Sequence, residues 1–352
     1  MRAIAAAALI AALPLCAAFA ESGAAAASLR ASPLRSSQAS LPESIQRETY
    51  AAIDRARQAL DAAISTPSAA VDTVQSATST APAAPAAPFA LLALCAPGSP
   101  DTASRAAAIE IERILAAAEA AISKPWEADF IFAVSAAVLA DASDISRPAS
   151  SDRPSLARIL SRLSRADISK LDADAAAFLL LALSAHGADT PAQWRALNQR
   201  LAASPQSAEE NPRLALQRAA LSALCRLMSA PAGRLSGPSP AAIAHLRWIS
   251  KRLDLRFGNN PVGADEILTP CAAFYTAMSA SRLPRTLFAA PAPPLPYDWR
   301  NHLASRIVTQ QLCSPADGAH YWNAAAPSAP PGAPESIRDT AFAILALLAI
   351  SD

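Results

Sequence analysis

Two kinds of hydrophobic pattern alternate along the chain. In the first kind, apolar residues recur at helical spacing between charged ones, as in Ile109-Glu110-Ile111-Glu112-Arg113. This spacing predicts helices with one solvent-exposed face. The stretches that show it are 43–64, 102–122, 155–164, 191–203, 240–253 and 299–312.

The second kind of stretch is apolar nearly all round. A helix without a polar face has to be buried on every side, so these stretches predict interior helices. They are 86–95, 127–140, 172–185, 212–228, 265–280 and 336–350, and each of them follows a stretch of the first kind.

The apolar stretches also resemble one another in sequence. Phe89 is followed by Ala-Leu-Leu-Ala-Leu, Phe178 by Leu-Leu-Leu-Ala-Leu and Phe342 by Ala-Ile-Leu-Ala-Leu, with weaker copies at Phe130 and Phe274. Similarity at intervals of roughly 40–50 residues is typical of a helical repeat array. The alternative is that any helices rich in alanine and leucine look alike.

The alternation of the two kinds predicts how the helices are arranged. An open superhelix would leave its inner, concave helices polar, whereas here the inner set is the apolar one, which favours a closed ring. The fold expected from the sequence is therefore all-α, an (α/α)6 toroid of about six helix pairs over residues 44–352.

The N-terminus has the layout of a secretory signal peptide. Arg2 precedes an apolar run that ends in Ala18-Phe19-Ala20, a small-x-small cleavage site. We expect a signal peptide at 1–20 and a periplasmic or secreted protein with no transmembrane span in its mature chain. An uncleaved anchor is the alternative, but the run is shorter than the roughly 20 apolar residues that span a bilayer. Lipidation at Cys16 is a further alternative.

Low-complexity segments interrupt the helical pattern. Residues 21–43 are rich in Ala and Ser and predict a disordered leader, and residues 65–88 predict a long surface loop. The chain has 30 Pro and 9 Gly. Because proline is excluded from helix interiors, these prolines predict many short helices.

The charge balance of the chain argues against one class of partner. The 30 Lys and Arg nearly balance the 29 Asp and Glu, and no basic stripe is present, so nucleic acid is not an expected partner.

Cys95, Cys225 and Cys271 lie in apolar stretches, where buried free thiols are expected. The wide spacing of the cysteines does not predict a disulfide framework.

The C-terminal unit carries a resemblance to a known superfamily. A charged stretch ends at Gln311, a turn contains Gly318 and Trp322, and Thr340-Ala341-Phe342-Ala343 opens an apolar stretch. This order resembles a repeat of the squalene cyclase and protein prenyltransferase superfamily. The resemblance implies an (α/α)6 toroid used for isoprenoid cyclisation, prenyl transfer or non-catalytic binding.

The catalytic features of that superfamily are incomplete in this chain. The Asp-x-Asp-Asp motif of the cyclases is approached by Asp172-Ala173-Asp174-Ala175, which lacks the last Asp. Cyclases also stabilise carbocations with aromatic rings, and aromatic residues make up 5% of this chain. The zinc-dependent prenyltransferases act on cytosolic proteins, which does not fit an exported chain.

Carboxylates gather at the starts of the apolar stretches. In a toroid the inner helices run parallel, so these starts would share one mouth. The candidate catalytic residues, as paired carboxylates for acid–base chemistry, are Asp129, Asp172, Asp174 and Asp339. The alternative is that they cap the helices, since carboxylates favour helix N-termini.

A second group of residues is expected to line the same mouth. These candidate ligand-binding residues are Trp126, Glu266, Tyr275, Tyr321, Trp322 and Arg338. Packing is the alternative role for the aromatic ones. Cys313, Asp317 and His320 lie close in sequence, but their spacing matches no zinc pattern and favours a polar turn, so no metal or cofactor is predicted.

The hypothesis that the sequence favours is an exported, non-catalytic module. It would bind a small molecule, a glycan or a protein at the toroid mouth. The alternative is an enzyme on the same fold, either polysaccharide-active or terpenoid-cyclase-like; that alternative rests on fold analogy.

Overall fold

The computed structural model describes residues 42–65, 87–95, 101–143, 154–203, 212–229, 269–280, 299–323 and 330–351. Within these residues the chain is mostly helical, which confirms the all-α expectation. The signal peptide at 1–20, nearly all of the leader and of the 65–88 loop, the 240–253 stretch and Glu266 lie outside the described residues.

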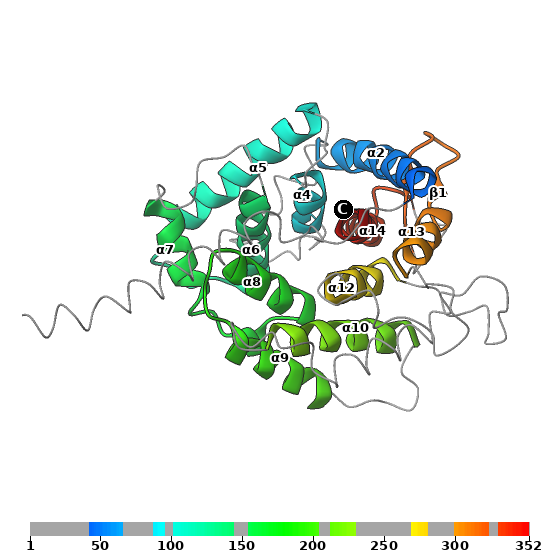
Figure 1. Ribbon diagram of the computed structural model, residues 1–352. Coiled ribbons are helices and arrows are strands. Elements are labelled where there is room, and N and C mark those ends of the chain that lie inside the picture. The colour runs from blue at the N-terminus through cyan, green and yellow to red at the C-terminus, as the bar shows by residue number, and fades with distance from the viewer. Residues whose placement is uncertain are drawn as a thin grey trace, which may run out of the picture.

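The stretches predicted to be amphipathic form helices that cover the others (Figure 1). They are α2 (Glu43–Ser65), α5 (Asp101–Ala120), α7 (Pro154–Leu163), α9 (Pro191–Ala203) and α13 (Trp299–Thr309). In α7, Leu156, Ile159 and Leu163 are buried on one face while the intervening arginines stay toward solvent. The amphipathic pattern therefore identified the covering layer.

The apolar stretches form the inner helices. They are α4 (Ala87–Cys95), α6 (Ala128–Ser143), α8 (Ala173–Ala185), α10 (Pro212–Met228), α12 (Pro270–Ala280) and α14 (Pro334–Ser351). In α8 every residue from Ala175 to Leu183 is buried, and in α14 every residue from Asp339 to Ile350. Figure 1 shows α4, α6, α12 and α14 lying inside the covering helices.

Most of the described inner helices that follow one another along the chain pack side by side, and α8 and α10 are the exception. Close packing joins α4 to α6, α6 to α8, α10 to α12 and α12 to α14, and the last inner helix α14 packs against the first, α4. Helix α2, the first that the structure describes, packs on α13 and α14, which lie far along the chain.

Proline and glycine mark the helix boundaries. Proline lacks an N–H and is preset for the first helical position, and it opens several of these helices, namely Pro154, Pro191, Pro212, Pro270 and Pro334. Helix α8 ends at Ala185, with His186 as its C-cap and Gly187, with φ 79°, after it. The Gly187 N–H donates to Ser184 and the Ala188 N–H to Leu183, the two bonds of a Schellman motif.

The segment between α13 and α14 differs from the prediction. We expected the outer helix to run to 312, but α13 ends at Thr309 and Leu312 belongs to the short strand β1 (Leu312–Cys313). This strand pairs antiparallel with β2 (His320–Tyr321), with Leu312 opposite Tyr321. The tight turn between them contains Gly318 with φ 68°, a conformation that favours glycine.

Phenylalanine rings meet where the inner helices converge. They come from α4, α6, α8, α12 and α14, and their centroids lie 4.6–6.0 Å apart. This phenylalanine cluster consists of Phe89, Phe132, Phe178, Phe274 and Phe342. The sequence comparison had paired Phe130 with the others, whereas Phe132 occupies that place and Phe130 contacts Trp126.

Within the described part of the chain, no helix is both long enough and apolar enough to traverse a bilayer.

Candidate functional site

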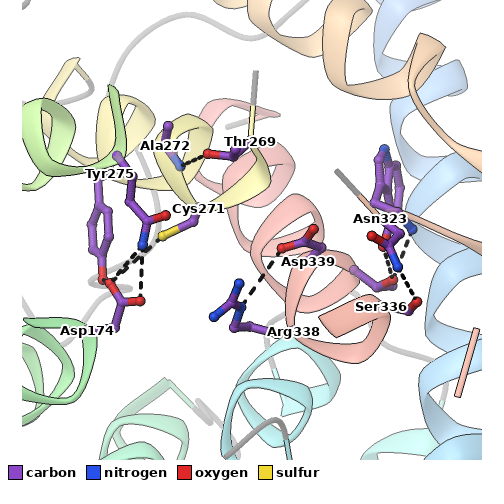
Figure 2. A network of polar contacts seen from close by, with 12 residues as sticks. Asp174, Thr269, Cys271, Ala272, Tyr275, Asn323, Ser336, Arg338 and Asp339 are labelled. Atoms are coloured by element: carbon purple, nitrogen blue, oxygen red, sulfur yellow. Dashed lines mark hydrogen bonds and ion pairs between the residues drawn. The ribbon is translucent and has the colours of Figure 1, made fainter. Parts of the chain in front are cut away.

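A polar network lies at the starts of α8 and α12, beside the middle of α10. It joins Asp174 in the first turn of α8 to Gln217 on α10 and to Cys271 and Tyr275 on α12 (Figure 2). We call these four residues the Asp174 network. The buried residues around it on these helices are mostly apolar, which makes a carboxyl group in contact with a hydroxyl, an amide and a thiol conspicuous.

Asp174 is the common acceptor of the Asp174 network. The Tyr275 hydroxyl donates to Oδ1 at 2.9 Å, and the Gln217 amide donates to Oδ2 at 3.2 Å. The Cys271 Sγ lies 3.9 Å from Oδ1, a weak contact. Tyr275 and Cys271 are buried, whereas Asp174 as a whole residue is only half-buried. Desolvation of its carboxyl is nevertheless the largest influence on its pKa, so the carboxyl group itself is enclosed by the neighbouring helices.

Burial sets the protonation of this network. It raises the pKa of the Asp174 carboxyl, and the nearby Asp172 raises it too, although the Tyr275 hydrogen bond, the Arg338 charge and the Gln217 hydrogen bond act the other way. Burial followed by the Asp174 charge likewise raises the pKa values of the Cys271 thiol and the Tyr275 hydroxyl well above their usual values. Burial therefore favours the neutral form of each of these three groups.

Arg338 and Asp339 flank the Asp174 network from the start of α14. The Arg338 Nε lies 4.0 Å from the Asp339 Oδ1, and the two side chains are 42% and 6% exposed. Figure 2 shows this pair facing the same region as Asp174 and Cys271. Two of the predicted carboxylates, Asp174 and Asp339, are thus in the region of the predicted ligand-binding residues Tyr275 and Arg338.

The other two predicted carboxylates have different surroundings. Asp172 is the N-cap of α8, and its Oδ1 accepts a hydrogen bond from the Ala175 N–H at 2.7 Å. This is the capping geometry that we considered as the alternative to catalysis. Asp129 lies in the first turn of α6, where it is exposed and outside the Asp174 network.

The other aromatic residues that were predicted to bind a ligand, two tryptophans and Tyr321, make packing contacts. The Trp126 indole N–H donates to the Ala121 carbonyl at 3.0 Å, and Arg162 lies over its ring. The Trp322 indole N–H donates to the Ile307 carbonyl at 2.7 Å, and its backbone N–H to the Thr340 hydroxyl at 3.0 Å. Tyr321 is buried in β2. The tryptophans therefore connect neighbouring segments.

The polar turn between β1 and β2 is held by hydrogen bonds within the turn itself. A bond from the Ser314 hydroxyl and a second from the Ala319 N–H lower the pKa of the Asp317 carboxyl. Cys313 lies opposite His320 in the β1–β2 pair. Within the described residues, no group of three or more His, Cys, Asp and Glu side chains is placed to hold a metal ion.

Sequence reasoning missed two members of the Asp174 network. Cys271 was predicted to be a buried free thiol, which the structure confirms together with buried Cys225, but its contact with Asp174 was not foreseen. Gln217 was not singled out. The available signal was that Gln217 is the one side-chain amide of α10 and follows the buried Leu216, because a polar group that is partly buried needs a partner.

No family model, curated protein or solved structure matches this chain. The chemistry of the Asp174 network therefore carries the functional argument without a relative.

Proposed function

We propose that this protein is an exported (α/α)6 toroid that binds a ligand at one mouth and does not catalyse a reaction. The ligand is a small molecule, a glycan or a protein segment. The mouth is formed by the starts of the inner helices, where Asp174, Tyr275 and Arg338 come together.

Contacts between the two ends of the chain support a ring. Helix α14 packs against α4, and α2 packs on α13 and α14, so the first and last helix pairs are neighbours. A complete ring of six pairs needs an outer helix at 240–253, which the sequence predicts outside the described residues. The resemblance to the squalene cyclase and prenyltransferase superfamily stays a prediction.

The Asp174 network is the observation that carries a binding role. Polar groups with strongly raised pKa values, gathered at one end of an alanine- and leucine-rich interior, are a feature of functional sites. Arg338 adds a partly exposed cation beside them. A mouth with hydrogen-bond donors, a carboxyl group and a guanidinium can fix the orientation of a polar ligand.

The phenylalanine cluster favours binding over terpenoid cyclisation. A cyclase needs a hollow lined by separate aromatic faces for its carbocations. Here the rings of Phe89, Phe178 and Phe342 contact one another at centroid distances of 4.6–6.0 Å, so they fill the space between their helices. This packing supports a solid centre with a ligand held at the mouth.

A polysaccharide-active enzyme is the second candidate. The observation in its favour is that the raised pKa of Asp174 suits a general acid, while a second carboxyl, that of Asp172, is close enough to affect it. The capping bond of Asp172 opposes this role, because that carboxylate is committed to the Ala175 N–H.

A thermal-shift screen tests the binding proposal. The purified protein is heated with divalent metal ions, with oligosaccharides and with isoprenoid alcohols, because a ligand that binds the folded state raises the melting temperature. The screen is repeated on Tyr275→Phe and Arg338→Gln, with Asp129→Asn as a control outside the network. We expect one class to raise the melting temperature of the wild type and the control, with a smaller rise in the two site variants.

Two outcomes would contradict the proposal. A ligand that stabilises all four proteins equally binds elsewhere, and no stabilisation by any class removes the support for a binding role at this mouth. Release of reducing sugar from an oligosaccharide, lost in Asp174→Asn, would establish the enzyme instead.

Export is tested separately by the N-terminus of the processed protein. Cleavage after Ala20 predicts that the protein recovered from the periplasm or the medium begins at Glu21. A protein that retains Met1 to Ala20 and stays inside the cell would contradict export.

A further inference from the structure

We propose that helix α9 is a lid over a seam in the inner layer, and that the protein opens at this seam before it opens elsewhere. This inference goes beyond the proposed function, because it concerns the side of the helical array and the protein without a ligand.

The seam lies between α8 and α10. The other described inner helices that follow one another along the chain pack closely, and so do α14 and α4. Between α8 and α10 direct packing is slight, and the Gln217 amide reaches across to the Asp174 Oδ2 at 3.2 Å. Close packing is what holds neighbouring helices together. The inner layer is therefore weakest at this place, which we call the α8–α10 seam.

Helix α9 covers the α8–α10 seam from outside. It packs on both α8 and α10, and Figure 1 shows it on the outer side of them. Its apolar anchors are Trp194, Leu197 and Leu201, which recur at helical spacing and are buried. The contacts of this one helix therefore take the place of direct packing between α8 and α10.

The buried side of α9 also carries polar atoms without partners. The Trp194 Nε1, the Asn198 Oδ1 and the Gln193 Oε1 are buried, and none of them has a hydrogen-bond partner within the described part of the chain. A polar atom that has lost its water without gaining a partner raises the free energy of the closed form. Lifting α9 returns water to these atoms, so it costs less free energy than lifting a helix whose polar groups are paired.

Helix α13 shows why the seam matters. It also has a buried side-chain atom without a partner among the described residues, the Asn301 Oδ1. The inner helices that it contacts, α12 and α14, nevertheless pack closely against each other, and the Trp322 indole N–H donates to the Ile307 carbonyl of α13. Lifting α13 would leave the inner layer joined, whereas lifting α9 removes the cover of a pair that is barely joined.

The two ends of α9 are held by different contacts. Before its start, the hydroxyls of Thr190 and Ser184 share a hydrogen bond at 2.7 Å, which ties α9 to the end of α8. Near its end, Arg200 donates to the Ile168 carbonyl, which lies in the segment before α8. The first contact spans a short turn and survives a rotation about that turn, but the second has to break. The start of α9 is therefore the pivot of the lid.

Hydrogen exchange of the full-length protein at low denaturant concentrations tests the lid. Amides that exchange through a local opening respond less to denaturant than those that need global unfolding, because less surface is exposed. The comparison is α5, a covering helix over the closely packed α4 and α6. We expect the α9 amides to exchange faster than those of α5 and with a weaker dependence on denaturant. Equal rates and equal dependence in α9 and α5 would overturn the proposal.

The unpartnered atoms are tested by substitution within α9. Asn198→Leu replaces a buried, unpaired oxygen by an apolar group, so exchange of the α9 amides is expected to slow by about tenfold. Gln199→Leu is the matched control, because Gln199 is exposed on the same helix, and it should leave these rates unchanged. The better helix propensity of leucine over asparagine accounts for about twofold at most. Slowing of no more than that in Asn198→Leu, or faster exchange, would also overturn the proposal.

Discussion

The Gln311 side chain donates a hydrogen bond to the Ala52 carbonyl oxygen at 2.9 Å, although 259 residues separate them in sequence. The Gln311 Oε1 also accepts from Arg55 at 3.1 Å. Gln311 follows the last outer helix, and Ala52 and Arg55 lie in the first. This glutamine therefore joins the two ends of the helical array.

Replacing Gln311 tests the strength of this junction. Gln311→Ala removes the bonds to Ala52 and Arg55 and is expected to lower the free energy of unfolding by about 1 kcal/mol, the net contribution of a hydrogen bond. The measurement is chemical denaturation, with Gln310→Ala as control because the side chain of Gln310 makes neither bond. Equal stability of the two variants would show that the junction does not depend on Gln311.

A substitution in the phenylalanine cluster is expected to reduce stability more than Gln311→Ala does. Phe178 is fully buried and contacts Phe89, Phe132, Phe274 and Phe342, so Phe178→Ala leaves a cavity between the inner helices. The free energy of unfolding should fall by about 3–5 kcal/mol.

Phe130→Ala is the matched comparison for Phe178→Ala. Phe130 is half-buried and contacts Trp126 instead of the cluster, so its loss should be clearly smaller. Denaturant titration measures the free energy of unfolding of both variants. A greater loss of this free energy in Phe130→Ala than in Phe178→Ala would contradict the central packing of Phe178.

The helix boundaries and layers were predictable because they depend on local pattern. The helices at 191–203 and 212–228 have the predicted bounds. A proline opens each of them, and each keeps a single hydrophobic pattern from its first residue to its last. The choice of Phe132 over Phe130 was not predictable. Both fit the repeat, and the rotation of α6 against its neighbours decides which ring points inward.

The Asp174 network was predictable only in part. Asp174, Tyr275 and Arg338 were candidates because the starts of the inner helices were expected to share one end of the predicted toroid. Gln217 was missed because it lies in mid-helix on α10, where only tertiary packing brings it to Asp174. A shift of two positions decides whether an aspartate caps its helix or contacts a neighbouring one: Asp172 is the N-cap of α8, and Asp174 accepts the Tyr275 hydroxyl.

Asp172 is expected to act through its cap. Asp172→Ala should lower stability by about 1 kcal/mol, whereas Asp172→Ser should retain most of it, because a serine hydroxyl can also accept the Ala175 N–H. Thermal denaturation measures both. If serine and alanine are equally destabilising, the carboxylate has a role other than capping.

Thiol reactivity follows burial. Burial raises the pKa of the Cys225 thiol to about 12 and that of Cys271 well above its usual value, and both are buried, while Cys313 is exposed. In the folded protein a thiol-alkylating reagent should modify Cys313 and leave Cys225 and Cys271 unmodified until denaturant is added. Peptide mass spectrometry identifies the modified residues, and rapid native labelling of Cys271 would contradict its enclosure.

The central claim is that α2 lies against α13, which is far from it in sequence. Cross-linking tests this claim most directly. Arg55→Cys and Gln311→Cys are introduced together in a Cys313→Ser background and treated with a short bismaleimide. Arg55→Cys with Arg195→Cys is the control, since α2 and α9 are not packed together. A ring closed by α2 against α13 predicts an intramolecular cross-link between residues 55 and 311 and none between 55 and 195. Absence of the 55–311 cross-link in the folded monomer would contradict the closed arrangement.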